Sequence, residues 1–224
     1  NRARAGAGIN HFGGDLSLRN ATVTQNNATD NGGGLYSHGS ATLQYVTVSD
    51  NSAGGSGNNI FIDESPLSIG SSIVAQAAGV TNCANSAGFV TSLGYNVESA
   101  ASCSMAATGD LTITNPLLGP LADNGGPTET QALLTGSPAI DHGDTASCPA
   151  TDQRGVARPV GTACDSGAFE GSGAEPTPTP TVTPGPTITP VPPLPLAIAV
   201  APPAPTTSDS VSITVSGVFT TSCT

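Results

Sequence analysis

The sequence repeats itself with a period of about 25 residues, and this repeat constrains the fold more than any other feature. Residues 22–28 (TVTQNNA) lie over residues 47–53 (TVSDNSA) when the chain is shifted by 25 positions. A third copy follows with one residue inserted, so residues 6–79 contain three repeats. The aligned apolar positions are Ile9, Leu35 and Ile60; Leu16, Ala41 and Leu67; and Leu18, Leu43 and Ile69. A period in the twenties is typical of solenoids, whose repeats stack on one another.

Each repeat contains short segments in which apolar and polar residues alternate, such as Leu16–Leu18 and Ala21–Thr24. Alternation with a period of two indicates strands with one buried face. Three short strands and three turns use up about 25 residues, which is one coil of a parallel β-helix, whereas a leucine-rich repeat needs a denser leucine pattern. We therefore predict an all-β fold, a parallel β-helix over residues 1–170, with clear coils in 6–79.

Two asparagines occupy the same column of the repeat, Asn26 over Asn51. At a turn, stacked amides can hydrogen-bond from one coil to the next and form a ladder. Alternatively, these asparagines only supply turn conformations. Both interpretations favour stacked coils.

The period fades after residue 80, and the cysteines begin there. Cys83 with Cys103, and Cys148 with Cys164, are the local pairings that close short loops, whereas Cys223 is left over. The chain has no CxxC pair, which argues against zinc and for disulfides in an oxidising compartment. Each such disulfide contributes roughly 3 kcal/mol by restricting the unfolded chain. We expect irregular, disulfide-stapled coils over residues 80–170.

Charge and composition exclude several classes of protein. The chain has 16 acidic residues against five arginines and no lysine, and its net charge is −11. Nucleic-acid binding needs clustered Lys and Arg, so we expect no nucleic-acid partner. No apolar stretch reaches 18 residues, so no membrane span is expected. The first residues lack the apolar core of a signal peptide, which suggests a processed or excised product.

Four segments in the second half carry a resemblance to a known family. They are Gly119–Thr128 (GPLADNGGPT), Gly136–Asp141 (GSPAID), Asp152–Gly155 (DQRG) and Cys164–Glu170 (CDSGAFE). With the repeats before them, they resemble the choice-of-anchor Q family of bacterial extracellular right-handed parallel β-helix proteins, which are similar to pectate-lyase-like and polymorphic outer-membrane repeat proteins. The resemblance covers roughly residues 5–170. It implies a right-handed, secreted or surface-exposed solenoid with no defined catalytic residues.

The composition changes after residue 170. Residues 171–195 form a linker in which Thr alternates with Pro, which favours polyproline II. This linker is either a site of O-glycosylation or a bare spacer. Its candidate threonines are Thr177, Thr179, Thr181, Thr183, Thr187 and Thr189. Residues 196–224 predict two strands, a hairpin or part of an immunoglobulin-like sandwich, which would need about seven strands to be complete.

Three acidic groups could serve the chemistry of a polysaccharide lyase, which needs clustered carboxylates or a base. Asp63-Glu64 precedes Ser65-Pro66 and favours a coil corner. Asp141-His142-Gly143-Asp144 could bind Ca²⁺, but its glycine favours a turn. Arg154 is expected to pair structurally with Asp152, Asp165 or Glu170. We therefore predict no enzymatic activity, no metal and no cofactor.

Two histidines and two glycosylation motifs complete the candidates. His11 and His38 follow Ile9 and Leu35 by two and three residues, and stacked imidazoles could bind a metal. Their loops offer too few further ligands, so solvated turn histidines are the better interpretation. Asn20 and Asn27 each begin an Asn-Ala-Thr motif for N-glycosylation.

Together these features predict a non-enzymatic extracellular structural protein. In one interpretation it is a surface or fibre-forming component, in which the C-terminal strands of one copy pair with the next and Cys223 links them. In the other it is a fragment of a glycan-binding surface adhesin. The expected partner is accordingly a second copy of the chain or a cell-surface glycan. A polysaccharide lyase is the third hypothesis.

Overall fold

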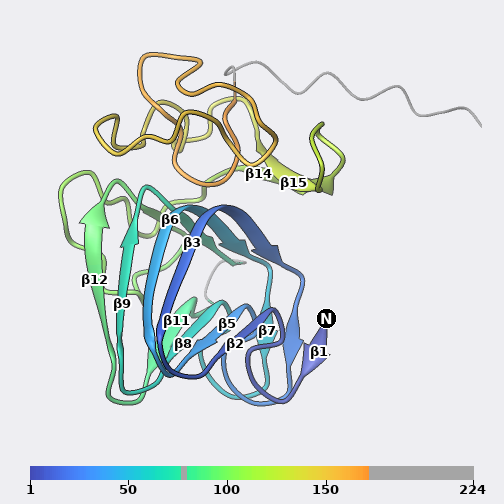
Figure 1. Ribbon diagram of the computed structural model, residues 1–224, viewed down its shortest axis with the longest axis vertical. Coiled ribbons are helices and arrows are strands. Elements are labelled where there is room, and N and C mark those ends of the chain that lie inside the picture. The colour runs from blue at the N-terminus through green and yellow to red at the C-terminus, as the bar shows by residue number, and fades with distance from the viewer. Residues whose placement is uncertain (77–79, 172–224) are drawn as a thin grey trace, which may run out of the picture. The chain divides into compact units, whose positions relative to one another are not determined.

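The computed structural model describes residues 1–76 and 80–171, and these residues form strands, turns and loops without any helix (Figure 1). Three parallel sheets and one antiparallel hairpin are present. Sheet A contains β1 (Arg2–Ala3), β4 (Asn27–Ala28) and β7 (Ser52–Ala53). Sheet B contains β2 (Ile9–His11), β5 (Leu35–Ser37), β8 (Ile60–Ile62) and β11 (Cys83–Asn85). Sheet C contains β3 (Asp15–Thr24), β6 (Ser40–Ser49), β9 (Pro66–Gly70), β10 (Ile73–Ala75), β12 (Phe89–Gly94) and β13 (Val97–Glu98). The hairpin joins β14 (Leu118–Ala122) to β15 (Thr130–Leu133).

The strands wind into about four coils of a parallel β-solenoid, which confirms the predicted fold. Strands from consecutive coils lie side by side in register, as in the pairs Leu18↔Leu43 and Ile9↔Leu35. The aligned columns of the repeat are therefore the hydrogen-bonded neighbours of the sheets. A fourth coil, formed by β11, β12 and β13, continues past the three repeats that the sequence shows.

The inward side chains of the coils form one apolar core. It includes Leu35, Leu43, Ile60, Leu67 and Ile69, each at most 1% exposed. They stack because residues in the same column of successive coils face the same way. Burying each such side chain contributes roughly 1.5–3 kcal/mol, which makes the stacked columns the main source of stability.

One corner of each coil is a backbone kink rather than a loop. Asn20, Tyr45, Ser71 and Tyr95 occupy equivalent positions in the four coils, and each has a φ between 48° and 58°. Left-handed conformations outside glycine cost about 1–3 kcal/mol each and persist when surrounding contacts hold them. Contacts from another part of the chain must therefore hold these four residues in the left-handed conformation.

Residues 117–171 supply those contacts, and we call them the lateral cap. The sequence predicts irregular coils up to residue 170, but after residue 114 the chain turns back and lies across the corners of the coils instead (Figure 1). Its contacts with the four corners are Asn20 Nδ2 to the Thr151 carbonyl, Tyr45 Oη to the Asp144 carbonyl, Gly167 N–H to the Ser71 carbonyl, and Ser166 Oγ to the Tyr95 carbonyl. The cap thus cross-links every coil.

A second apolar core explains why these residues do not form further coils. It joins Ile73 and Val97, on the outer side of sheet C, to Leu133, Ala139 and Phe169 of the lateral cap. The apolar residues of the cap are therefore buried against the outside of the solenoid. The cap approaches so closely at Gly167 (φ +91°) that a Cβ there would lie 2.7 Å from Ile73 Cδ1. Glycine is required at that position.

Both predicted local disulfides are present. Cys83 of β11 is bonded to Cys103, and Cys148 is bonded to Cys164 within the lateral cap. The described residues contain nothing helical that could cross a bilayer. The predicted linker and two-strand tail, Cys223 and the six candidate threonines lie outside the described residues.

Candidate functional site

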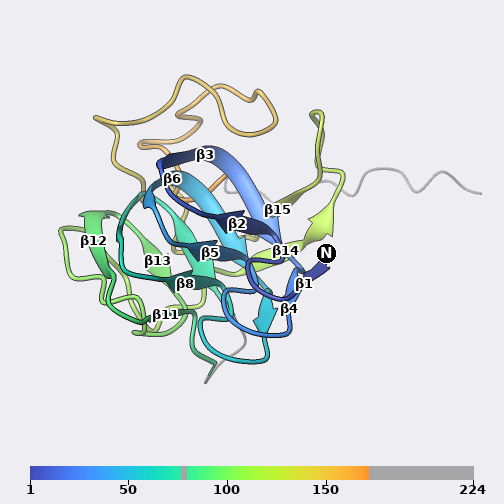
Figure 2. The same ribbon diagram turned by 60° about the horizontal axis from the view of Figure 1, so that its bottom comes forward.

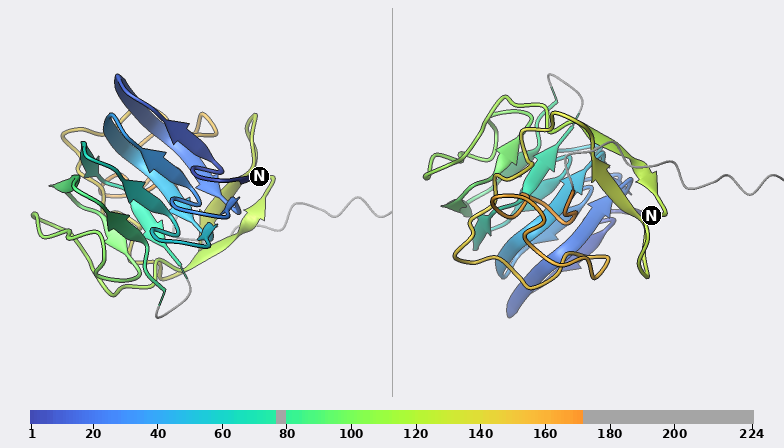
Figure 3. Two further views of the ribbon diagram at one scale, coloured as in Figure 1. Left: turned by 90° about the horizontal axis from the view of Figure 1, so that it is seen from below. Right: turned by 90° about the horizontal axis from the view of Figure 1, so that it is seen from above.

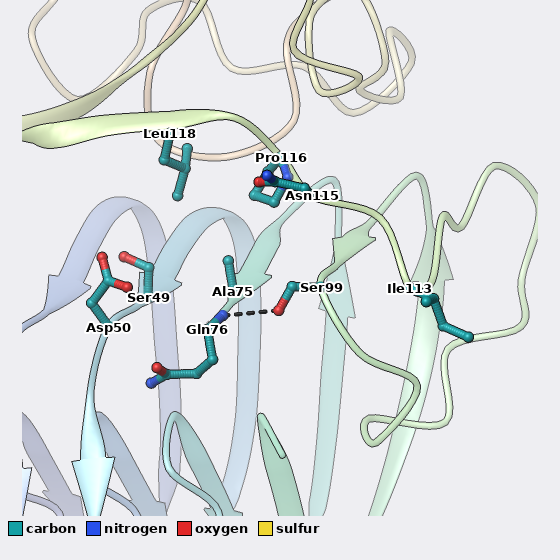
Figure 4. A pocket seen from close by; sticks show the side chains of 9 residues that line it. All are labelled: Ser49, Asp50, Ala75, Gln76, Ser99, Ile113, Asn115, Pro116 and Leu118. Atoms are coloured by element: carbon teal, nitrogen blue, oxygen red, sulfur yellow. Dashed lines mark hydrogen bonds between the residues drawn. The ribbon is translucent and has the colours of Figure 1, made fainter. Parts of the chain in front are cut away.

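One pocket, of about 430 Å³, opens between the ends of the sheet C strands and the start of the lateral cap (Figure 4). Ser49 and Asp50 come from the end of β6, and Ala75 and Gln76 from the end of β10. The segment 113–118 passes over them and closes the other side. The lining residues are Ser49, Asp50, Ala75, Gln76, Ser99, Ile113, Asn115, Pro116 and Leu118.

The polar groups of this pocket are engaged with structural neighbours. Ser49 Oγ donates to Gln131, and Gln131 Nε2 donates to Asp50 Oδ2 at 3.1 Å. The Gln76 N–H donates to Ser99 Oγ at 2.8 Å. Asp50 is the one ionisable side chain among the lining residues, whereas acid–base and nucleophilic chemistry require at least two cooperating groups. Among its lining residues, the pocket offers one carboxylate and no second ionisable group to act with it.

A second candidate site lies on the outer face of sheet B, and we call it the aromatic patch. It consists of Phe12, Tyr36 and Phe61, with His38 and Asp63 along one edge. Tyr36 and Phe61 are paired in register, and their rings are stacked with centroids 5.5 Å apart and planes 9° apart. The Phe12 ring lies 5.6 Å from Tyr36 and 5.9 Å from His38. Their backbone neighbours Leu35 and Ile60 face the core, so strand alternation directs Tyr36 and Phe61 outward.

Asp63 organises the edge of the aromatic patch. Its carboxylate accepts hydrogen bonds from Ser86 Oγ and from the Tyr36 hydroxyl, and His38 Nδ1 lies 3.4 Å from it. The bond from Ser86, and then that from Tyr36, lower the pKa of Asp63 below its ordinary value, so this carboxylate is ionised at neutral pH. The hydrogen bond that Tyr36 donates to Asp63 raises the pKa of the Tyr36 hydroxyl to about 12. Burial and the negative charge of Asp63 contribute to the same shift.

This pairing gives a spectroscopic prediction. The Tyr36 hydroxyl should titrate near pH 12 in the intact protein, and D63N should move its pKa down toward the ordinary 10.0, because the anionic acceptor is removed. Tyrosine ring NMR signals followed between pH 8 and about 12.5 measure this shift. E64Q removes the neighbouring charge without touching the hydrogen bond and should change the pKa much less. Equal shifts in the two variants would refute the role of the bond.

The predicted ion-pair residues meet inside the lateral cap. Arg154 pairs with Asp152, its Nη2 lying 2.7 Å from Oδ2, and its guanidinium stacks on the Phe169 ring at 3.5 Å. Glu170 pairs instead with Arg158, at 3.1 Å between Nη1 and Oε2. The sequence left Asp152, Asp165 and Glu170 as possible partners of Arg154. Its side chain pairs with Asp152, and it also donates a hydrogen bond to the Glu170 carbonyl.

Asp165 has no arginine bonded to its carboxylate. Its oxygens accept the N–H groups of Asp141 and Gly171, and it is 1% exposed. Burial raises the pKa of Asp165 to about 6, although the two N–H bonds oppose this shift. The folded protein therefore holds this proton up to about pH 6, whereas the unfolded chain releases it near the ordinary value of 3.8.

The sign of the resulting pH dependence follows from this difference. The protonated Asp165 side chain contributes to the free energy of unfolding in full below about pH 4. This contribution, about 1–3 kcal/mol, is lost as the pH rises to about 6. D165N should therefore show a smaller decrease in the free energy of unfolding between pH 4.5 and 7.5 than the unmodified protein, as measured by urea denaturation at roughly these two values. Identical pH profiles for D165N and the unmodified protein would contradict the assignment.

The remaining acidic candidates serve turns. Asp141 Oδ1 accepts the Ala163 N–H at 2.9 Å and Asp144 Oδ1 accepts the Ala146 N–H at 3.1 Å, while His142 Nε2 contacts the Gly109 carbonyl. The predicted turn at Asp141–Asp144 is thus present. The corner at Glu64, which has φ 59°, is present too.

The two histidines do not stack. The register pairs His11 with Ser37, so His38 falls in a different column and contacts Asp63 instead. His11 Nδ1 lies 2.9 Å from Ser37 Oγ. Within residues 1–76 and 80–171, no group of three His, Cys, Asp or Glu residues could hold a metal ion.

The asparagine ladder is present and is longer than the sequence suggests. Asn26 Nδ2 donates to Asn51 Oδ1 at 2.9 Å, as expected of a ladder. From Asn51 it continues to Asn59 at 2.9 Å, Asn82 at 3.0 Å and finally the Glu98 carboxylate at 3.3 Å. These side chains are buried, so the amides satisfy one another across the coils.

Both candidate N-glycosylation amides are engaged in the folded chain. Asn20 Nδ2 donates to the Thr151 carbonyl at 2.6 Å, and Asn27 Nδ2 donates to Ser52 Oγ at 2.8 Å. A glycan on either nitrogen would replace a donor of these bonds, and at Asn20 it would also displace the lateral cap.

Comparisons of the chain with protein-family models, with curated proteins and with solved structures found no match.

Proposed function

We propose that the protein is a non-enzymatic extracellular structural protein, a surface or fibre-forming component. The observation that carries this proposal is the lateral cap, which is bonded to the corner of every coil. Together with the buried ladder and two disulfides, these bonds cross-link the coils, which supports the role of a rigid scaffold. Rigidity of this kind suits a durable scaffold outside the cell, where disulfides persist.

The ionisable residues support the same proposal. Of the carboxylates that the sequence offers for lyase chemistry, Asp141, Asp144 and Asp152 are bonded to backbone or to Arg154, and Asp63 accepts bonds from Tyr36 and Ser86. Incubation of the full chain with polygalacturonate and Ca²⁺ should release no unsaturated uronates. Release that depends on the protein would overturn a non-enzymatic role.

Assembly through strands is part of this proposal. Among the described residues, β2 and β3 each pair along one edge only, with β5 and β6. An unpaired strand edge accepts a further strand by β-augmentation, and the predicted tail strands of a second copy are the proposed donors. Electron microscopy of the full chain at high concentration should show head-to-tail filaments. Monodisperse monomers at every concentration would refute assembly.

Glycan binding is the second candidate function, and one observation favours it. In the aromatic patch Phe12 is 68% exposed and contacts Tyr36, whose hydroxyl is bonded to Asp63, and exposed rings next to polar groups mark binding surfaces. Membership of the choice-of-anchor Q family, on the four segments that the lateral cap contains, is compatible with either role and is proposed on that resemblance.

A further inference from the structure

The aromatic patch lies on an open face of the solenoid. Strands β2, β5, β8 and β11 lie side by side in Figure 2 and in the left view of Figure 3, and Phe12, which follows β2, is 68% exposed. Phe12, Tyr36 and Phe61 come from successive coils, with ring centroids 5.6 and 5.5 Å apart, and Phe61 is 8% exposed, so Phe12 and part of Tyr36 form the accessible surface over a buried Phe61. The two accessible rings come from neighbouring coils, so a ligand that contacts both extends along the solenoid.

We propose that the aromatic patch binds a neutral saccharide chain, an inference that rests on the second candidate function. A pyranose ring has an apolar face of C–H groups and a rim of hydroxyls. The apolar face packs on Phe12 and on the exposed part of Tyr36, as flat apolar groups pack on aromatic faces. The hydroxyl rim then reaches the polar edge of the patch.

Asp63 is the polar group that orients the sugar. An ionised carboxylate has about four acceptor positions; Tyr36 and Ser86 donate to two of them, and His38 Nδ1 lies 3.4 Å from Oδ2. The side chain of Asp63 is 24% exposed, so a free position faces solvent. Sugar hydroxyls are donors that fit this acceptor, and its two protein bonds fix its direction before the ligand arrives.

Charge selects a neutral saccharide over an acidic one. The charges that act on Tyr36 come from Asp63, Asp30 and Glu64, all carboxylates. Arg4 is paired with Asp30, Arg19 donates to the Ser147 carbonyl, and Arg154 and Arg158 are bound within the lateral cap. His38, at the edge of the patch, adds positive charge only when it is protonated. Uronates and sulfated sugars would meet repulsion here, because like charges brought together raise the free energy of binding.

The full chain should be tested by affinity electrophoresis and calorimetry with neutral polysaccharides (laminarin, xyloglucan and mannan) and with acidic polygalacturonate. We expect saturable binding to at least one neutral polymer and none to polygalacturonate. F12A should weaken binding about tenfold, a change of about 1.4 kcal/mol. D63N should also weaken it, while leaving the fold intact by circular dichroism.

Phe89 provides the matched control, since it is 58% exposed on β12, in sheet C rather than sheet B. F89A should bind within twofold of the unmodified protein. If F12A and F89A bound the neutral polymer equally well, the site would lie elsewhere and the inference would be overturned. Binding to polygalacturonate alone would refute a neutral ligand but support glycan binding. If no polymer bound, both the neutral-saccharide inference and the glycan-binding function would be refuted, and the scaffold proposal would remain.

Discussion

Replacing Asn59 with alanine is expected to lower the free energy of unfolding by about 2–4 kcal/mol, because three buried partners lose a hydrogen bond. Asn59 Oδ1 accepts from Asn51 Nδ2 at 2.9 Å, and its Nδ2 donates to Asn82 Oδ1 at 3.0 Å and to the Ala75 carbonyl at 2.9 Å. Asn59 is fully buried, so water cannot replace these bonds. Each unsatisfied buried group costs roughly 1–3 kcal/mol, and some relaxation offsets the sum.

Urea denaturation followed by far-UV circular dichroism measures this loss, since the chain has no tryptophan for fluorescence. N27A is the matched control, because Asn27 also donates to a neighbouring coil, at 2.8 Å to Ser52 Oγ, but is exposed. Water replaces its partner, so N27A should cost less than about 0.5 kcal/mol. Equal losses in the two variants would show that the buried ladder adds nothing to stability.

The coils could be predicted from the sequence because stacking makes register visible. Residues in contact across a parallel sheet are one coil apart, so the column of Leu18 over Leu43 is itself a structural contact. The fourth coil, which falls within the irregular coils expected after residue 80, shows no clear repeat because its length changes: β11 starts at Cys83, 23 residues after Ile60 rather than 25 or 26. Its inward positions also include Cys83, whose disulfide takes the place of an apolar column.

The lateral cap could not be predicted, since its contacts carry no period. Gly167 reaches Ser71 and Tyr45 reaches Asp144, and pairs so far apart leave no mark in a single sequence. Arg158 was missed for the same reason, although it is the most buried of the cationic side chains that form ion pairs.

The aromatic patch was within reach of the sequence. Ile9, Leu35 and Ile60 were aligned as an inward column, so the next residues in two of these coils, Tyr36 and Phe61, had to face outward in register. The arrangement of Asp63 was not within reach, because it depends on where Glu64 and Ser65 turn the chain. Alternation predicts which face a side chain occupies, but the geometry of a corner decides which neighbours it meets.

The largest expected effect belongs to Arg158, whose replacement by methionine should lower the free energy of unfolding by about 3–5 kcal/mol. Its side chain is fully buried, pairs with Glu170 and donates to the carbonyls of Asp165 and Gly167. Methionine keeps much of the volume but leaves the Glu170 carboxylate buried without its cation. A buried charge without its partner is more costly than the pair it came from. The lateral cap should therefore loosen first, and hydrogen exchange of the Gly167 amide, which is bonded to Ser71, should report it before the coils unfold.

Two further variants separate charge from packing. In R158M/E170Q the buried carboxylate is gone, so the double variant should recover part of the stability that R158M loses, since the unpaired charge causes much of the loss. R19M removes an arginine that also contacts the cap, at 2.8 Å from Nη2 to the Ser147 carbonyl, but at an exposed position, and should cost less than about 1 kcal/mol. If R158M and R19M lost equal stability, the buried pair would not be what holds the cap. If the double variant were no more stable than R158M, lost packing rather than the unpaired Glu170 charge would explain the effect, including the packing of Arg158 on the Tyr45 ring, whose centroid lies 4.9 Å from the guanidinium carbon.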